Sequence, residues 1–235
     1  MKVKLLKYTE GGVKLVAKSA RVSGVPDTLS DEEIVRMIVE NDYTSALEHI
    51  SFTFDLKDIS IALSRELLEH RIASHTARST RYQEEGGFGY FIPAEIKNDK
   101  EARKQYKAAM KELSKAYLDL KEMGISRESR RYVLPIAAHT NYVWTVNARS
   151  LLNFLGLRLC VRASPEIRDL ARKLHDIVVD IYPEIFKDMG CRGQTLAVCP
   201  ENEVRDSPQG KGCPHKVKGS KTYIPTKKEV REKKL

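Results

Sequence analysis

The stretch from Arg65 to Tyr82 contains many side chains that can hold an anion. Its sequence, RELLEHRIASHTARSTRY, combines four arginines and two histidines with several hydroxyl groups. A guanidinium beside hydroxyl and backbone N–H groups binds phosphate well, because its planar fork offers paired, permanently charged hydrogen bonds. Basic residues are also common at helix C-termini, where they offset the helix dipole. Taken alone, the stretch is as consistent with a solvated basic helix end as with a phosphate site.

A second stretch, Asn147–Arg158, has the sequence NARSLLNFLGLR. Arg149, Asn153 and Leu157 are spaced four residues apart, so a helix would place them on one face. Such a helix can present a guanidinium and an amide to the same ligand. By itself the pattern also fits a surface amide at Asn153 and, at Arg158, a cation that stabilises the C-terminal end of the helix.

The element expected to position the first stretch is a helix. The run Asp58–Ser74 lacks Gly and Pro and has apolar residues at helical spacing, which predicts a helix with His70 and Arg71 near its C-terminal end. Ser79 and Arg81 are two residues apart and would face the same way in an extended segment. A turn is then expected at the Glu-Glu-Gly-Gly sequence that follows.

Hydrophobic patterns predict further elements on both sides. Two alternating runs, Lys2–Tyr8 and Val13–Lys18, are separated by two glycines and predict a hairpin. Ser30 and Glu33 have the spacing of a capping box, which opens a helix. The other expected elements are strands at Ile50–Leu56 and Thr140–Val146, and helices at Asp99–Gly124 and from Ser164 to Ile181.

Composition and charge limit the class of protein. The 235 residues carry a net charge of +9, which resembles the footprint of a nucleic-acid-binding protein. From Lys211 onward, however, nine Lys or Arg face two Glu, so this tail holds +7 and the first 210 residues only +2. We therefore expect no nucleic-acid partner. No apolar run approaches the roughly 18 residues of a membrane span, and no signal peptide is evident, so we expect a cytoplasmic protein without a membrane partner.

The last part of the chain differs from the rest. Cys191, Cys199, Cys213 and His215 could in principle hold zinc, but no two cysteines have the CxxC spacing, which favours free thiols in a reducing compartment and no metal. We divide the chain into a catalytic domain of residues 1–190 and a Cys-containing, Lys-rich extension of residues 191–235. The tail from Gly219 is expected to be mobile at its end.

Several motifs resemble the flavin-dependent thymidylate synthases. His70-Arg71, seven further residues and then Ser79-Thr80-Arg81-Tyr82 are similar to the family's signature, Arg-His-Arg followed seven residues later by Ser-x-Arg-Tyr. The other matching stretches are Ala20–Ser23 (ARVS), Ser45–His49 before a strand, Arg131–Pro135 (R-x-V-L-P) and Asn147–Arg158 (N-A-R-S/E-L-x-N-F-L-x-L-R). The resemblance covers most of one domain, from about Ala20 to Ile181.

The resemblance implies a fold and an activity. The fold would be α+β, with a central antiparallel sheet surrounded by helices, as in flavin-dependent thymidylate synthases. The activity would be reductive methylation of dUMP to dTMP, with methylenetetrahydrofolate as carbon donor and FAD, reduced by NADPH, as hydride source. The protein would orient these molecules and place charge. Family members assemble as homotetramers whose active sites are shared between subunits.

The resemblance also implies roles for individual residues. Arg158 would activate the uracil ring by stabilising negative charge at its N3–O2 edge. The residues expected to bind dUMP are Glu66, Glu69, Ser79, Thr80, Arg81, Arg131 and Arg158. The residues expected to bind FAD are Ser23, Ser45, Glu48, His70, Arg71, Ile72, Asn147, Arg149 and Asn153.

Some positions depart from the family pattern. The first Arg of the signature is Glu69 here, Tyr43 and Arg162 stand where members often have His, and Ala77 is a further departure. Two alternatives follow. The chain could be a weakened family paralogue that binds nucleotide but turns over poorly, or a nucleic-acid-binding protein whose salt-dependent binding survives removal of Arg158.

Overall fold

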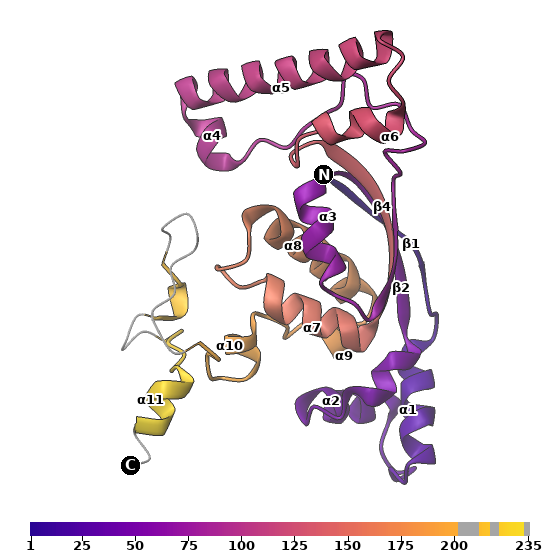
Figure 1. The fold of residues 1–235 in the computed structure, drawn as a ribbon. Coiled ribbons are helices and arrows are strands. Elements are labelled where there is room, and N and C mark those ends of the chain that lie inside the picture. The colour runs from indigo at the N-terminus through magenta and orange to yellow at the C-terminus, as the bar shows by residue number, and fades with distance from the viewer. Residues whose placement is uncertain (202–211, 217–220, 233–235) are drawn as a thin grey trace. The chain divides into compact units, whose positions relative to one another are not determined.

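The computed structural model of the protein describes residues 1–201, 212–216 and 221–232 (Figure 1). It combines helices with an antiparallel sheet, in agreement with the predicted α+β class. Within the described ranges, no helix is long and apolar enough to cross a membrane. The predicted mobile tail from Gly219 lies partly outside the described residues.

Four strands form one sheet, in the order β1-β2-β4-β3. They are β1 (Lys2–Tyr8), β2 (Ser51–Ser60), β3 (Ala73–Ala77) and β4 (His139–Asn147). The strand β4 comes last in the sequence and yet lies between β2 and β3, so distant parts of the chain must meet to build the sheet. Along β2, Phe52, Phe54 and Leu56 are buried, as the predicted alternation requires.

Helices and short 3₁₀ turns account for the other elements. The helices are α1 (Gly12–Val22), α2 (Asp31–Glu40), α3 (Ile61–Leu68), α4 (Ala94–Asn98), α5 (Lys100–Glu122), α6 (Arg127–Arg130), α7 (Ala148–Arg158), α8 (Pro165–Ile181), α9 (Pro183–Phe186), α10 (Arg192–Thr195) and α11 (Lys227–Glu232). The 3₁₀ turns are η1 (Thr44–His49), η2 (Arg131–Val133) and η3 (Pro214–Lys216).

The chain divides into two compact units. The first comprises Met1–Lys4 and Phe54–Trp144, and the second comprises Leu5–Thr53 and the chain from Thr145 onward. The division passes through β1, β2 and β4, so each of these strands contributes residues to both units. The separate extension beginning at residue 191 remains a prediction.

The first unit contains a buried aromatic pair on β2 and β4 and the long helix α5. Trp144 and Phe54 are fully buried, and their ring centroids lie 6.3 Å apart. The helix α5 begins where the Asp99 carboxylate accepts a hydrogen bond from the Ala102 N–H at 2.8 Å. It ends just before Gly124, whose φ of +74° suits glycine. Both ends of this helix agree with the prediction.

The second unit is built around Tyr182 and Phe186. Both rings contact Phe52, with centroids 6.0 and 5.9 Å away. The Tyr182 hydroxyl accepts a hydrogen bond from the Gly12 N–H at 2.9 Å and donates one to the Thr9 carbonyl oxygen. A Cβ atom on Gly12 would stand 2.6 Å from that hydroxyl oxygen, so only glycine fits the start of α1. Burial raises the pKa of Tyr182, which keeps the hydroxyl protonated and able to donate.

The predicted N-terminal hairpin is half wrong. Strand β1 has the predicted bounds, but the predicted second strand lies within α1. Val16, Ala17 and Ala20 are buried, at the spacing of a helix face. The short alternating run is compatible with the period of a strand and with that of a helix. The chain forms the helix because this face of α1 packs against α2. The predicted capping box is confirmed, because Ser30 and Glu33 exchange both hydrogen bonds at the start of α2.

The predicted helix from Asp58 to Ser74 is also wrong at both ends. Strand β2 continues to Ser60, whose hydroxyl caps the eight-residue helix α3. After α3 the chain forms β3, where His75 contacts the Tyr142 hydroxyl through Nδ1 at 2.9 Å and the His70 carbonyl oxygen through Nε2 at 3.1 Å. Hydrogen bonds to β4 outweigh the helical preference of this segment. His70 and Arg71 therefore lie in the connection between α3 and β3.

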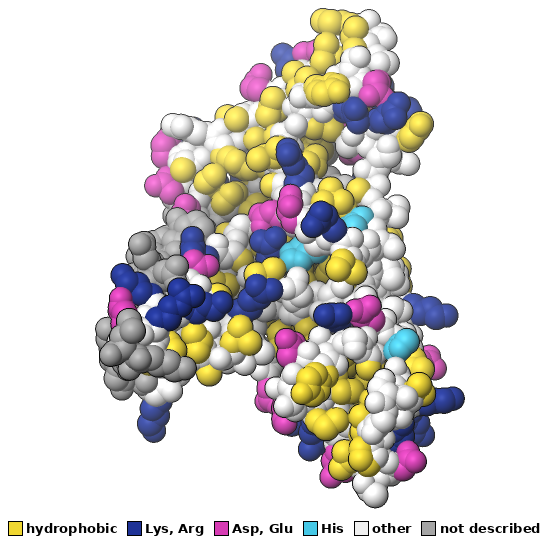
Figure 2. Space-filling view, turned by 60° about the horizontal axis from the view of Figure 1, so that its bottom comes forward, with side chains coloured by type: hydrophobic (Ala, Val, Ile, Leu, Met, Phe, Trp, Pro, Cys, Tyr) yellow, Lys and Arg dark blue, Asp and Glu magenta, His cyan; other side chains and the backbone are white. Residues whose placement is uncertain are grey.

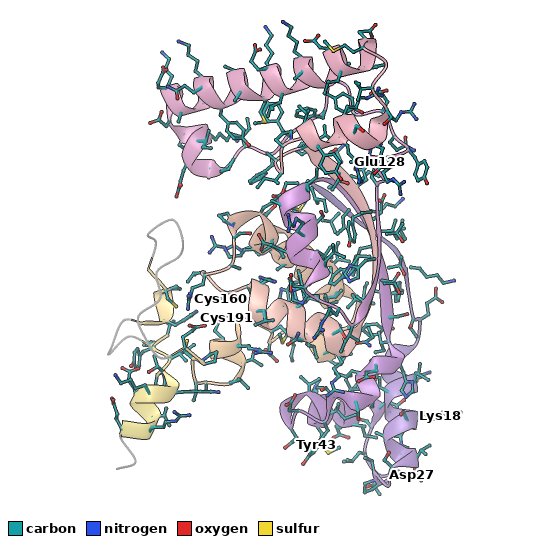
Figure 3. All side chains as sticks on the ribbon, in the orientation of Figure 1. Lys18, Asp27, Tyr43, Glu128, Cys160 and Cys191 are labelled. Atoms are coloured by element: carbon teal, nitrogen blue, oxygen red, sulfur yellow. The ribbon has the colours of Figure 1, made fainter. Side chains whose placement is uncertain are left out.

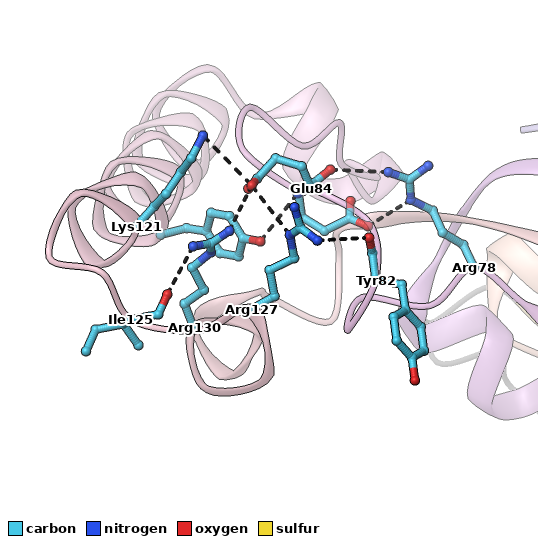
Figure 4. A network of polar contacts seen from close by, with 9 residues as sticks. Arg78, Tyr82, Glu84, Lys121, Ile125, Arg127 and Arg130 are labelled. Carbon is cyan, nitrogen blue, oxygen red and sulfur yellow. Dashed lines mark hydrogen bonds and ion pairs between the residues drawn. The ribbon is translucent and has the colours of Figure 1, made fainter.

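An ion pair with a buried guanidinium holds α6 against the loop that follows β3 (Figure 4). Arg130 donates to the Glu84 carboxylate at 2.8 Å and lies 5.1 Å from the Tyr117 ring centroid. Lys121 and Arg127 approach the same carboxylate at 3.8 Å. Burial pushes the pKa of Glu84 upward, but Arg130, the Tyr117 hydroxyl and Lys121 outweigh it and leave that pKa below its ordinary value.

We expect Tyr182→Phe to destabilise the protein by about 1–3 kcal/mol, because it leaves the buried Gly12 N–H without its acceptor. Urea unfolding of the wild type and the variant measures this difference. The matched control is Tyr132→Phe, since that side chain is 80% exposed and its variant should unfold like the wild type. Equal stability of Tyr182→Phe and wild type would contradict the proposed role of the hydroxyl.

Two arginines of α6 allow a matched test of the ion-pair network. The Arg130 side chain is 7% exposed and that of Arg127 is 47% exposed, although both approach Glu84. Loss of a buried partner leaves a polar group uncompensated, whereas exposed pairs contribute little, so the thermal midpoint should fall at least ~3 times further in Arg130→Ala than in Arg127→Ala. Equal shifts would show that burial of Arg130 is unimportant.

Candidate functional site

Two of the predicted nucleotide ligands of the first unit, Arg81 and Arg131, meet at one carboxylate. Glu128 accepts hydrogen bonds from Arg81 Nε and from an Arg131 Nη atom, the latter at 2.9 Å. Arg131 Nε also donates to the Glu128 backbone carbonyl oxygen at 3.3 Å. Two guanidiniums that are 50 residues apart in the sequence are thus brought together at the surface, where Figure 3 labels Glu128. Such a pair is a suitable receptor for a phosphate group.

The contact with Glu128 affects the pKa of Arg81. The hydrogen bond from Arg81 to Glu128 and their opposite charges raise the pKa of Arg81. The side chains are accessible, since 54% of Arg81 and 47% of Glu128 are exposed. The Arg81 guanidinium therefore stays charged, and an incoming anion can reach it.

Ser79 and Thr80 lie in a turn and not in the predicted extended segment. The Ser79 carbonyl oxygen accepts hydrogen bonds from the backbone N–H groups of Tyr82 and Gln83, at 3.3 and 3.0 Å. This turn is additional to the predicted one, which the structure has at Gly86 and Gly87. It arises because local hydrogen bonds already reverse the chain at Ser79.

A second ion pair supports this turn. Arg78 Nε donates to the buried Glu85 carboxylate at 2.8 Å, and an Arg78 Nη atom donates to the Glu84 carbonyl oxygen at 3.2 Å. The Arg127 guanidinium donates to the Tyr82 carbonyl oxygen at 3.3 Å. The segment that carries Ser79, Thr80 and Arg81 is therefore tied at its end to α6, which directly precedes Arg131.

The other predicted residues of the first unit lie on α3 and just after it. Glu66 is half-buried on α3, and Glu69 is the exposed residue at the end of that helix. His70 is half-buried, whereas Arg71 and Ile72 are exposed. The structure thus presents a carboxylate at Glu69, where the family signature has a guanidinium.

The predicted flavin ligands of the second unit lie mainly on α7 and η1. Arg149 and Asn153 lie on an exposed face of α7, as the spacing predicted, and Arg149 donates to the Glu48 carboxylate at 2.6 Å. The Asn153 amide oxygen accepts a hydrogen bond from Arg192 at 2.6 Å. Asn147 caps α7 by accepting from the Ser150 N–H at 2.8 Å. Its carbonyl group therefore has a structural task in addition to the predicted flavin contact.

Two further predicted flavin ligands line a cavity of about 370 Å³. Ser23 follows α1 and Ser45 belongs to η1, and Tyr43 and His49 line the same cavity. Tyr43 is 66% exposed, so this departure from the family places an aromatic ring at the entrance of the cavity.

Arg158 ends α7 and lines a larger cavity of about 1260 Å³. Arg162 and Arg192 also line it, and Arg162 forms an ion pair with Glu201. Figure 2 shows Lys and Arg side chains gathering on one side of the face that it draws, whereas elsewhere on that face they are mixed with Asp and Glu. A cavity with several guanidiniums is suited to anionic ligands.

Sequence reasoning missed Glu128 and Arg192, which form hydrogen bonds with predicted site residues. Glu128 is three residues before Arg131, a spacing at which oppositely charged side chains meet on a helix, so a local signal was present. Arg192 is 39 residues from Asn153 and carries no local signal. Only the tertiary structure brings it to α7.

Comparison with known proteins identifies the family to which this chain belongs. A family profile described as "Thymidylate synthase complementing protein" matches residues 4–184. The "Flavin-dependent thymidylate synthase" of Geobacter sulfurreducens is 37% identical over 213 residues, which cover 86% of this chain and 91% of that protein. The proteins of the same name from Sulfurisphaera tokodaii and Pyrococcus abyssi are 36% and 35% identical, over 88% and 87% of this chain and 83% and 91% of their own lengths. Matches of this extent show that the chain belongs to the family of flavin-dependent thymidylate synthases.

Proposed function

We propose that this protein converts dUMP to dTMP, with methylenetetrahydrofolate as carbon donor and FAD, reduced by NADPH, as hydride source. The observation that carries the proposal is the pairing of Arg81 and Arg131 on Glu128, because it presents two guanidiniums to a phosphate. Arg81 and Arg131 belong to two of the motifs that resemble the family. We further propose the fold of that family, a homotetramer with shared active sites, and a cytoplasmic location.

The nucleotide phosphate would take hydrogen bonds from Arg81 and Arg131, with Ser79 and Thr80 beside them. Exposed ion pairs contribute only about 0–1 kcal/mol, so a doubly charged phosphate can compete with Glu128 for both guanidiniums. Glu128 then serves to keep two like charges close together until the nucleotide arrives. The remaining predicted dUMP ligands are Glu66 and Glu69.

Arg158 would act on the pyrimidine ring. Attack by C5 on the one-carbon unit is helped when negative charge at the N3–O2 edge of the ring is stabilised by a fixed cation. Arg158 is half-buried at the end of α7 and lines the larger cavity, a position from which its guanidinium charge can act strongly. In this proposal the protein activates the ring with the positive charge of Arg158, and no nucleophilic side chain needs to attack the ring.

The donor set of the second unit fits a flavin dinucleotide. Arg149 offers a cation for the pyrophosphate, and its side chain is 52% exposed and held by a single exposed carboxylate. Asn153 offers an amide, and Ser23 and Ser45 offer hydroxyl groups beside a cavity. When bound, FAD supplies the hydride chemistry. The other residues proposed to hold it are Glu48, His70, Arg71, Ile72 and Asn147.

The first test is tritium release from C5-labelled dUMP in the presence of FAD, NADPH and methylenetetrahydrofolate. We expect Arg158→Ala to lower the rate by about 10²–10³-fold, the effect of removing one preorganised donor to developing negative charge. The matched control is Arg172→Ala, which removes an exposed arginine of α8 and should leave release unchanged. Undiminished release by Arg158→Ala would contradict its assigned role, and no release by the wild type would contradict the function.

A second test concerns the phosphate. Arg131→Ala should raise the KM for dUMP by about 10–100-fold, because it removes a charge-assisted bidentate donor. The weaker inhibition by deoxyuridine, which lacks the phosphate, should stay the same, so the preference for dUMP over deoxyuridine should shrink. Arg103→Ala, an exposed arginine of α5, is the matched control. Equal losses for dUMP and deoxyuridine would show that Arg131 does not bind the phosphate.

A further inference from the structure

All four cysteines of the chain line the larger cavity of the second unit. Cys160 follows the end of α7, Cys191 precedes α10, and Cys199 and Cys213 lie further along the chain. All four are free thiols and half-buried. The sequence patterns had grouped three of them with His215 and had left Cys160 out. The structure adds a fourth thiol to the group.

The segment that carries three of these cysteines is held by polar contacts and not by an apolar core. Among the described residues after Phe186, no hydrophobic side chain is buried, and Gly193 alone falls in the buried class. Backbone hydrogen bonds join Cys199 N–H to the Pro225 carbonyl oxygen at 2.8 Å and Lys227 N–H to the Cys199 carbonyl oxygen at 3.0 Å. A short segment without an apolar core usually needs a disulfide or a metal ion for stability.

Two of the cysteines lie close to the same residue, Gly193. Cys191 Sγ and Cys199 Cβ lie 3.7 and 3.6 Å from the point where a Cβ atom on Gly193 would stand. Figure 3 labels Cys160 and Cys191, both of which line this cavity. Four sulfur atoms from separate segments thus converge on one region.

Their present spacing is wider than that of an assembled metal centre. In the described ranges, no three side chains of His, Cys, Asp or Glu are grouped closely enough to hold a metal ion. Binding must therefore draw the thiols inward. The free energy of zinc binding would offset the cost of this movement, because structural zinc sites contribute folding free energy directly. Each coordinating thiol would give up its proton on binding.

We propose that Cys160, Cys191, Cys199 and Cys213 bind one zinc ion as a tetrahedral tetrathiolate site that fastens the C-terminal segment to the end of α7. Four thiolates leave no open position, so the site is structural. Arg162 and Arg192 line the same cavity and would offset the net negative charge of such a centre. His215 also lines the cavity, but four sulfurs complete the coordination shell without it.

The site would also affect Arg158, which lies two residues before Cys160. Fastening Cys160 would limit the motion of the last turn of α7 and so fix the guanidinium there. This consequence rests on the proposed function, whereas zinc binding does not. Arg158 would gain a positioning partner in Cys160, and loss of zinc would lower kcat without changing the identity of the substrate.

The test is the zinc content of the full chain purified from zinc-supplemented medium. We expect about one zinc per chain for the wild type, roughly a tenth of that or less for Cys160→Ser and Cys213→Ser, and an unchanged content for His215→Ala. Replacement by cobalt should give the intense visible absorption of a tetrahedral cobalt thiolate in the wild type and in His215→Ala. Circular dichroism checks that each variant is folded.

A chelator applied to the wild type makes the test independent of the variants. It should release the zinc, make four thiols reactive and lower the thermal midpoint, and added zinc should restore the midpoint. A wild type without zinc, disulfides among the four cysteines, or full zinc retention by Cys160→Ser would each overturn the proposal. Because zinc content needs no substrate, a zinc-loaded protein without tritium release would overturn the function and leave this site standing.

Discussion

Charge compensation is the constraint on which the candidate site depends. A protein that binds anionic nucleotides needs several guanidiniums, and these repel one another when no ligand is present. Here Glu128 holds Arg81 and Arg131, and Glu48 holds Arg149. Each carboxylate occupies a position that a ligand phosphate could take over. In the proposed site, these guanidiniums are therefore in place before a ligand arrives.

The ion pairs differ in how readily they can be exchanged. The pairs of Arg81 with Glu128 and of Arg149 with Glu48 are about half exposed, so little stability is lost when a ligand displaces them. The pair between Arg130 and Glu84 has a buried guanidinium that also contacts Tyr117. This pair is part of the framework. Of two neighbouring arginines, Arg130 thus supports the fold, and Arg131 belongs to the proposed binding site.

The two ends of α7 connect the proposed activity with the proposed zinc site. Asn147 caps the start of the helix, and Arg149 and Asn153 lie on its exposed face. Arg158 and Cys160 follow at its end, beside the cavity that collects all four cysteines. This helix and the residues directly after it therefore carry proposed flavin ligands, the proposed cation for the pyrimidine ring and one proposed metal ligand. Its exact placement matters to each of them.

Local signals in the sequence determined much of this protein. The capping box of α2, the ends of α5, the strand at Phe52–Leu56 and the helical face of Arg149 and Asn153 are confirmed, because each depends on neighbours within a few residues. The family motifs were equally visible, since they are contiguous.

Only the tertiary structure decided the features that depend on distant partners. Pairing with β4 made β3 a strand where the sequence favours a helix, and packing against α2 made α1 a helix where the sequence favours a hairpin. Glu128 meets Arg81 across 47 residues, and Arg192 meets Asn153 across 39. Cys160 joined the other cysteines for the same reason. Spacing along the chain reports contacts within one element, whereas contacts between elements follow from burial and hydrogen bonding in the folded chain.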